Sequence, residues 1–374
     1  MSRRDEPVIE DPARSPETDR RLLTRRRFIG RVGAAVAATS GAGLALSACG
    51  SSNGSSSGTG GSGGKKLQKV TYLLIIPPSL DTTADLMADA GGHFADNGLD
   101  VTIEQARGGS PQAIQAMISG KGLLTRLGLV ETAVDVASRG APLVSVGQIM
   151  KGDTLVFVSS SAKKAIRSPA DFRGATIGVP SAGGTSETTL NLLLQSAGIP
   201  PKSVKRQVIG PPSPANYGLV KQGRIDGYAS STDAAVVVSL QNPDAVVLTP
   251  TDFITLGQTY VTTRDQLTSQ RNALQRYLRS VEAAMKAVIA DKSDGYAKTM
   301  STIGKKYDLE ILAEKKAARE VLDREVAAWT LGGRQNLLKN VPARWQQVYR
   351  EILKGKLVKP GLDPSRWYTN ELLS

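Results

Sequence analysis

Two glycine–hydroxyl segments carry side chains that could bind a small polar ligand. Gly184, Thr185 and Ser186 stand where a helix is predicted to begin. Exposed backbone N–H groups and hydroxyls at a helix N-terminus suit an anion or a polar oxygen. An ordinary helix cap is the alternative role for such residues. The comparable segment earlier in the chain consists of Gly109, Ser110 and Gln112.

A second group of candidates combines carboxylates with hydroxyls at the ends of predicted strands. The carboxylates could bind an amine or a ring nitrogen, in which case the ligand would not be a simple anion. Solvent exposure or helix capping is the alternative for each of them. The candidates are Asp81, Thr82, Thr83, Glu131, Thr132 and Asp233.

The residue types give little support to catalytic or metal chemistry. The chain has one cysteine, Cys49, and one histidine, His93. An intrachain disulfide and a Cys/His zinc site are therefore excluded. The sequence also contains no Gly-x-Ser-x-Gly nucleophile segment. We expect a binding protein without catalytic residues, metal or cofactor, and not an enzyme.

The composition is that of a globular protein with a basic surface. Of the 374 residues, 40% are hydrophobic and 22% are charged, and the net charge is +13. The basic residues are scattered through the body, which favours a solvated surface, with a bias toward anionic ligands as the alternative. Aromatic residues make up only 5% of the chain, so we expect no nucleic-acid partner.

The first 48 residues are typical of an export signal. Residues 24–29 (TRRRFI) resemble the twin-arginine motif, and the apolar stretch 32–46 that follows is short for a transmembrane helix. An N-terminal anchor helix is the alternative. Residues 46–49 (LSAC) resemble the bacterial lipobox, which predicts cleavage before Cys49 and a diacylglycerol on its thiol.

The body alternates apolar, β-branched runs with amphipathic segments, which predict strands and helices respectively. This alternation indicates parallel α/β sheets, followed by a mainly helical region from about residue 265. Two such units suggest two lobes with a cleft, in which ligand loops follow the carboxyl ends of strands. The predicted strands are 70–76, 99–105, 142–148, 154–159, 175–179, 205–209 and 225–230, and the predicted ligand loops are 77–83, 108–112, 130–132, 180–187 and 230–233.

Four segments resemble the solute-binding proteins of the SsuA/THI5-like (NMT1) family. The most specific is residues 166–179 (IRSPADFRGATIGV), which resembles the family's I-x-S-P-A-D-L-x-G-K-x-I-G-V segment. Residues 93–101 (HFADNGLDV) resemble F-x-x-x-G-L-D-V, residues 223–227 (GRIDG) resemble G-x-V-D-A, and residues 183–186 (GGTS) match a further stretch. Order and spacing agree over residues 67–250, whereas the helical tail matches only loosely.

The resemblance implies a type II periplasmic-binding-protein fold, with two α/β lobes, a hinge, a ligand cleft between the lobes and a helical C-terminal region. Known family ligands include sulfonates, taurine, nitrate and pyrimidine precursors of thiamine. Together with the signal, the resemblance implies a monomeric lipoprotein, exported by the twin-arginine route and anchored to the outer face of the cell membrane through Cys49. It would pass a sulfur- or nitrogen-containing organic nutrient to an ABC permease and its ATPase.

Two other functions remain as alternatives. A solute-sensing surface lipoprotein without a transporter would share all of these sequence features. An enzyme like the pyrimidine synthases of this fold is disfavoured, because their Cys-rich motif has no counterpart in the body of the chain.

The resemblance also sets the expected domain division and one departure. Residues 120–128 (GKGLLTRLG) place Arg126 near the family's usual Asp, so we expect an altered strand end close to the candidates Glu131 and Thr132. The expected divisions are 1–48 signal peptide, 49–66 lipidated cysteine and Gly/Ser linker, 67–158 first part of lobe I, 159–250 lobe II, and 251–374 return to lobe I with the C-terminal helices.

Overall fold

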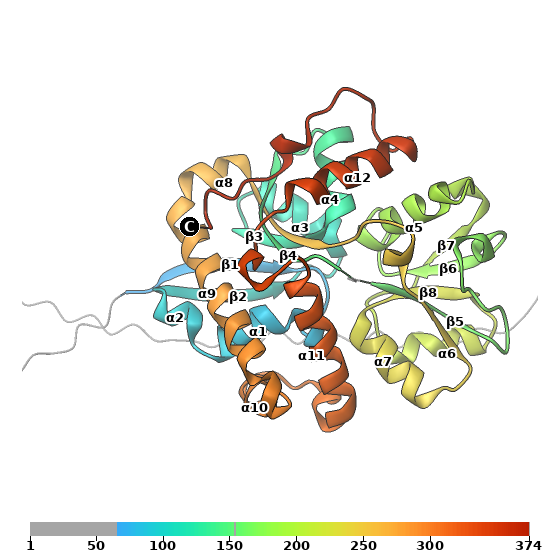
Figure 1. The fold of residues 1–374 in the computed structure, drawn as a ribbon, viewed down its shortest axis with the longest axis horizontal. Helices are drawn as coiled ribbons and strands as arrows, with labels where there is room; N and C mark the ends of the chain where they lie inside the picture. Colours follow the sequence, from blue (N-terminus) through green and yellow to red (C-terminus); the bar gives the residue numbers. More distant parts are fainter. Residues whose placement is uncertain (1–65, 153–154, 374) are drawn as a thin grey trace, which may run out of the picture. The chain divides into compact units, whose positions relative to one another are not determined.

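The computed structural model describes residues 66–152 and 155–373, which form two five-stranded sheets with helices packed on them (Figure 1). The twin-arginine segment, Cys49 and the Gly/Ser linker lie outside the described residues. Within the described ranges, no helix combines the length and the apolar character needed to cross a membrane.

The first sheet has the strand order β2-β1-β3-β10-β4. β1 pairs in parallel with β2 and β3, whereas β10 runs antiparallel to both β3 and β4. Its strands are β1 Gln68–Leu74, β2 Leu99–Gln105, β3 Leu124–Gly128, β4 Leu143–Met150 and β10 Gln258–Thr263.

The second sheet has the strand order β7-β6-β8-β5-β9. β6 pairs in parallel with β7 and β8, whereas β5 runs antiparallel to both β8 and β9. Its strands are β5 Val156–Ser160, β6 Thr176–Val179, β7 Lys205–Val208, β8 Gly227–Ser230 and β9 Ala245–Leu248.

The expectation of purely parallel sheets is wrong, because each sheet contains an antiparallel strand. β5 and β10 are the strands that the chain enters directly after passing from the other sheet. Parallel neighbours need a long crossover, usually a helix, whereas β5 and β10 follow short passages from the other sheet and lie beside the edge strands β9 and β4. The strand therefore runs against its parallel neighbours.

The predicted boundary after residue 158 falls inside β5, whose pairing lies wholly in the second sheet.

Helices pack against both sheets. The helical segment from Thr83 to Asp96 is split into two helices, because Gly92 adopts a left-handed conformation with φ of 80°. The next helix begins at Gly109. The helices are α1 Thr83–Ala90, α2 His93–Asp96, α3 Gly109–Ile118, α4 Leu129–Ser138, α5 Thr185–Ser196, α6 Tyr217–Lys221, α7 Thr232–Gln241, α8 Arg264–Ser269, α9 Arg271–Ala290, α10 Ala297–Gly304, α11 Lys315–Thr330 and α12 Pro342–Lys354, with a 3-10 turn η1 at Leu80–Thr82.

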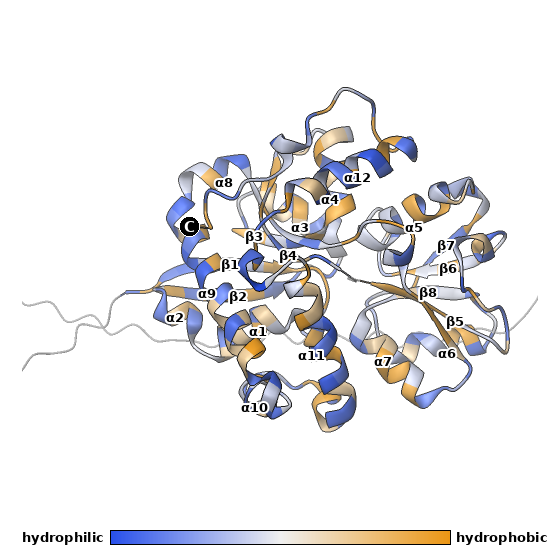
Figure 2. Ribbon diagram, viewed as in Figure 1, coloured by the Kyte–Doolittle hydropathy of each residue, from blue (hydrophilic) through white to orange (hydrophobic). Residues whose placement is uncertain are grey.

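The apolar core follows the two sheets. One cluster gathers around Tyr72, Tyr260 and Trp329, where α1, α9 and α11 pack on the first sheet. A second cluster joins strands of the second sheet to α4 and α12 and contains Trp345 and Trp367. Figure 2 shows hydrophobic residues along β5 and β8 and hydrophilic ones over much of α12. The three tryptophans are buried packing residues.

Candidate ligand-binding site

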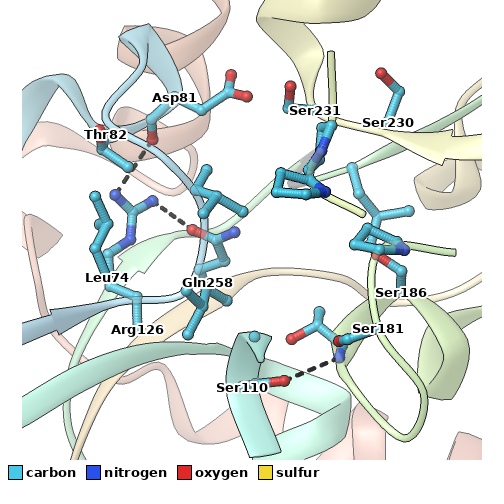
Figure 3. Close-up of a pocket in the computed structure, with 18 of the residues that line it drawn as sticks. Leu74, Asp81, Thr82, Ser110, Arg126, Ser181, Ser186, Ser230, Ser231 and Gln258 are labelled. Carbon is cyan, nitrogen blue, oxygen red and sulfur yellow. Dashed lines mark hydrogen bonds between the residues drawn. The ribbon is translucent and has the colours of Figure 1, made fainter. Parts of the chain in front are cut away.

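A cavity of about 950 Å³, open to solvent, lies between the two sheets. Its walls come from the segments that follow β1, β6 and β8, from the start of α3, and from α11 (Figure 3). Three of these segments follow the carboxyl ends of parallel strands, which is where open α/β sheets hold their ligands. The cavity therefore lies where the strand pattern places the ligand loops.

Six of the predicted ligand residues line this cavity. They come from three different segments, of which two belong to the first sheet and one belongs to the second. The structure thus brings together residues that lie about a hundred positions apart in the sequence. These residues are Asp81, Thr82, Gly109, Ser110, Thr185 and Ser186.

The other six predicted residues lie beside the cavity without forming its wall. Thr83 and Thr132 donate their hydroxyls to the carbonyl oxygens of Leu80 and Gly128, at 2.6 and 2.9 Å. The remaining four pack behind the lining or hold neighbouring backbone. They are Gln112, whose Oε1 accepts from the N–H of Gly108, Glu131, Gly184, and Asp233, which lines an adjacent cavity.

Two glycines allow the loops of the two sheets to meet at the cavity floor. A Cβ added to Gly109, whose φ is 70°, would stand 2.6 Å from the hydroxyl oxygen of Ser181. A Cβ added to Gly184 would stand 2.7 Å from the same oxygen and 3.0 Å from that of Ser110. A side chain at either position would displace the hydroxyl of Ser181 or Ser110, and the positive φ of Gly109 also favours glycine, so glycine suits this close approach.

Glu131 links the start of α3 to the start of α5 through hydrogen bonds. Its carboxylate accepts hydrogen bonds from the hydroxyl of Ser110, at 2.6 Å, and from the hydroxyl of Thr185. The main-chain N–H of Thr185 in turn donates to Ser110 Oγ at 3.3 Å. Burial raises the pKa of Glu131 to about 7, although the two hydroxyl hydrogen bonds lower it. Glu131 therefore acts on the site through the hydroxyls it holds.

Arg126 reaches the cavity from the middle of β3 but is fully engaged by the protein. Its guanidinium forms an ion pair with Asp85 at 3.1 Å and donates to the main-chain carbonyl of Asp81 at 3.2 Å. It also donates to Gln258 Oε1, as Figure 3 shows, and contacts the sulfur of Met150. This buried cation is therefore neutralised before any ligand arrives.

Asp85 is the hub that holds this cation. It is fully buried and also accepts hydrogen bonds from the hydroxyls of Tyr260 and Tyr277, at 2.6 and 2.9 Å. The hydroxyl of Tyr72 approaches it at 3.4 Å. Four donors on one carboxylate satisfy a buried charge that would otherwise be costly.

Three carboxyl groups, those of Asp81, Asp233 and Glu325, lie near one another at the cavity. Asp81 lies in η1, Asp233 is the second residue of α7, and Glu325 lies on α11, which packs against both of these elements. The N–H of Asp233 donates to Asp81 Oδ1 at 3.3 Å. Burial, with Asp233 and Glu325 nearby, raises the pKa of Asp81 well above its usual value. Burial raises the pKa of Glu325 to about 8, while Arg126 lowers it.

Gln258, Arg126 and Glu325 are among the lining residues that were not identified as ligand residues from the sequence. Gln258 comes from β10, a Thr-rich strand that the apolar pattern does not reveal. Arg126 was noted only as a departure from the family pattern. Glu325 lies in the helical tail, yet it had a detectable signal, since it occupies the apolar stripe of α11 between Val321 and Trp329.

Comparison with known proteins places the chain in a family. The family profile described as NMT1/THI5 like matches residues 79–294, which is more than half of the chain. The chain belongs to the NMT1/THI5-like family. This confirms the resemblance drawn from the four sequence segments. No curated protein matches the chain in a sequence search.

Solved structures show which fold this NMT1/THI5-like chain adopts. A protein from Bordetella bronchiseptica RB50 superposes with a TM-score of 0.67 at 17% identity, over 82% of this chain and 96% of that one. The alkanesulfonate-binding protein SsuA from Xanthomonas axonopodis pv. citri, bound to MOPS, gives 0.59 at 15% identity, over 81% and 98%. The periplasmic nitrate-binding protein NrtA from Synechocystis PCC 6803 gives 0.59 at 13% identity, over 82% and 87%. The chain has the type II periplasmic-binding-protein fold.

Proposed function

We propose that this protein is the extracytoplasmic substrate-binding component of an ABC importer. Its ligand would be a small sulfur- or nitrogen-containing organic nutrient. The observation that carries this proposal is the cavity between the two sheets, which is lined by the ligand loops of both. A receptor of this kind binds without catalysis and signals occupancy to the permease and ATPase by closure of its lobes.

Proteins of similar fold support the proposal through their own ligands and partners. Two of them bind alkanesulfonates and nitrate, and a third, from Staphylococcus aureus, is the ligand-binding component of an ABC-type import system. The S. aureus protein has a TM-score of 0.57 at 16% identity to this chain. A shared fold leaves the ligand of this chain to be measured.

Membrane anchoring is part of the proposal and rests on the N-terminal motifs. A diacylglycerol on Cys49 would hold the protein at the outer face of the membrane. Cys49→Ser should move the protein to the soluble fraction and remove the lipid from its mass. The double substitution Arg25→Lys with Arg26→Lys should block export if the twin-arginine route is used. Membrane attachment that persists in the Cys49→Ser variant would contradict the lipid anchor.

A thermal-shift screen of the purified protein tests ligand binding. The panel includes alkanesulfonates, taurine, nitrate, thiamine pyrimidines, riboflavin and aromatic carboxylates, and mass spectrometry identifies any ligand that co-purifies. A compound at 100 times its Kd should add about 2.7 kcal/mol to the free energy of unfolding. A panel without a hit, together with no co-purified ligand, would contradict a solute receptor.

A matched pair of variants tests whether the cavity is the binding site. Thr185→Ala with Ser186→Ala removes two lining hydroxyls and should weaken binding at least tenfold, about 1.4 kcal/mol. Thr268→Ala with Ser269→Ala is the control, because these exposed hydroxyls donate only to carbonyls of their own helix, α8. Equal affinities in the two double variants would remove the α5 loop from the site.

A further inference from the structure

Several hydrogen-bond donors that could bind an anion in this cavity are already used by the protein, whereas the buried hydroxyl of Ser230 in the lining has no partner among the described residues. The hydroxyls of Ser110 and Thr185 donate to Glu131, and the N–H of Thr185 donates to Ser110 Oγ. The N–H of Gly183 donates to the carboxylate of Glu187 at 2.7 Å. Oxygen atoms of Glu131, Glu187 and Ser110 thus already accept from these donors.

The cations at the cavity are equally unsuited to an anion. Arg126 is paired with Asp85 and donates to two further oxygens, so its charge and its donors are largely engaged. The second basic residue of the lining, Arg107, is exposed and lies on the solvent side. A buried anion gains little from a cation that is already neutralised or solvated.

Acceptors, by contrast, remain available on buried side chains of the lining. Asp81 is 7% exposed and Glu325 is 2% exposed. Across the part of the chain that the structure describes, Asp81 Oδ2 and Glu325 Oε2 have no hydrogen-bond partner of normal geometry. Asp233 lies close to Asp81, and the indole N–H of Trp329 lies close to Glu325. A buried carboxyl oxygen without a donor is costly, and a ligand that donates to it removes the cost.

Figure 3 shows how the lining is arranged around these acceptors. The carboxylate of Asp81 points away from the guanidinium of Arg126 and lies on the side of the cavity nearer Ser231. Much of the remaining wall is apolar, with Leu74, Met150 and Leu155 contributed by three strands or their ends. The site therefore combines unpartnered carboxyl oxygens with a surface that suits a hydrocarbon body.

We propose that the ligand of this cavity is an organic amine, whose ammonium group donates to Asp81 and Glu325 while its apolar part packs against Leu74, Met150 and Leu155. This inference deepens the proposed function and rests on it. It names the substrate class, because an ammonium group supplies a positive charge opposite the buried carboxylates and hydrogen-bond donors for their unpartnered oxygens.

Matched pairs of small probes test the proposal by isothermal titration calorimetry on the purified, ligand-free protein. Benzylamine is compared with benzenesulfonate, and pentylamine with pentanesulfonate, so that each pair shares its apolar part. We expect the amines to bind at least tenfold more tightly than the sulfonates. A preference for the sulfonates, or no binding by either amine, would overturn the amine assignment. The proposed function is judged separately by the co-purified ligand and the wider panel.

Isosteric variants locate the acceptors. Asp81→Asn and Glu325→Gln should each weaken amine binding tenfold or more. Glu320→Gln is the control, because Glu320 lies on the same helix as Glu325 but pairs with Arg324 at the surface. Wild-type affinity in both Asp81→Asn and Glu325→Gln would reject these acceptors. Thermal melting of each variant shows whether it is folded, and the amine-to-sulfonate preference of the wild-type protein decides the ligand class without any variant.

Discussion

Replacing Asp85 with Asn should destabilise the protein more than any surface substitution of the same kind. The change keeps the size of the side chain but removes the charge that balances Arg126. It also replaces one acceptor oxygen by an amide that can only donate, opposite the hydroxyls of Tyr260 and Tyr277. Each of these groups is buried, so water cannot replace the lost charge or accept the hydrogen bonds that the carboxylate oxygen accepted.

The magnitude follows from the buried ion pair. Removing one partner of such a pair typically costs about 3–5 kcal/mol, because the other charge stays buried without compensation. A hydroxyl left without an acceptor adds about 1–3 kcal/mol when the site does not relax. We therefore expect Asp85→Asn to lower the free energy of unfolding by roughly 3–5 kcal/mol, since the amide oxygen still accepts one hydrogen bond.

Urea unfolding at pH 7 measures this loss, with the fluorescence of the buried Trp329 and the far-ultraviolet circular dichroism as probes. Asp89→Asn, on the same helix, is the control, because Asp89 pairs with the half-exposed Lys306 and the amide oxygen can still accept from the hydroxyl of Tyr307. That pair should contribute about 1 kcal/mol or less. A double variant with Arg126→Met should lose about 1–3 kcal/mol less than the sum of the two single losses. Equal, small losses in Asp85→Asn and Asp89→Asn, with additive double variants, would refute the ion-pair hub.

Two further predictions concern pH. Burial raises the folded-state pKa of Glu131 to about 7, above its unfolded value, so the free energy of unfolding should fall by up to about 3 kcal/mol as pH rises from about 4.5 to 7. In urea unfolding, Glu131→Gln should make the free energy of unfolding depend less on pH over this range. An unchanged pH dependence in the variant would contradict the assignment. Burial raises the pKa of Glu325 to about 8, with Arg126, Asp81 and Asp233 also facing the site. Because Glu325 must ionise to bind an ammonium group, calorimetric affinity for benzylamine should rise between pH 6 and 8.5 in the wild-type protein, and a pH-independent affinity would argue against this role.

The sequence predicted the site best where a ligand loop directly follows a strand that the local apolar pattern reveals. The loops after β1 and β6 could be predicted because each follows a short apolar strand, and the carboxyl ends of parallel strands meet at one edge of a sheet. Asp81 and Thr185 line the cavity for this reason. The close approach of Gly109 to Ser181 and of Gly184 to Ser110 could not be predicted, since it depends on how the two sheets face one another.

The parts of the site that the sequence did not predict come from long-range pairing. β10 lacks the apolar alternation of the other strands because buried Thr259 and Thr262 satisfy their hydroxyls on carbonyl oxygens of the same lobe. Gln258 at its start was missed with it. Arg126 has an unusual type for a buried strand, and its partner Asp85 lies on another element. An ion pair of this kind can be recognised only in the three-dimensional structure, where side chains from β3 and α1 meet.

The strand order also fixes when each lobe can be completed as the chain is synthesised. The second sheet, from β5 to β9, is continuous in sequence and can assemble once residue 248 is available. The first sheet begins earlier, but β4 must wait for β10, which is made only after the whole second sheet. Pairing over so long a separation is slow, and an unpaired strand edge is prone to aggregate meanwhile. The lobe that is started first is therefore finished last, since its sheet is complete only when β10 pairs with β3 and β4.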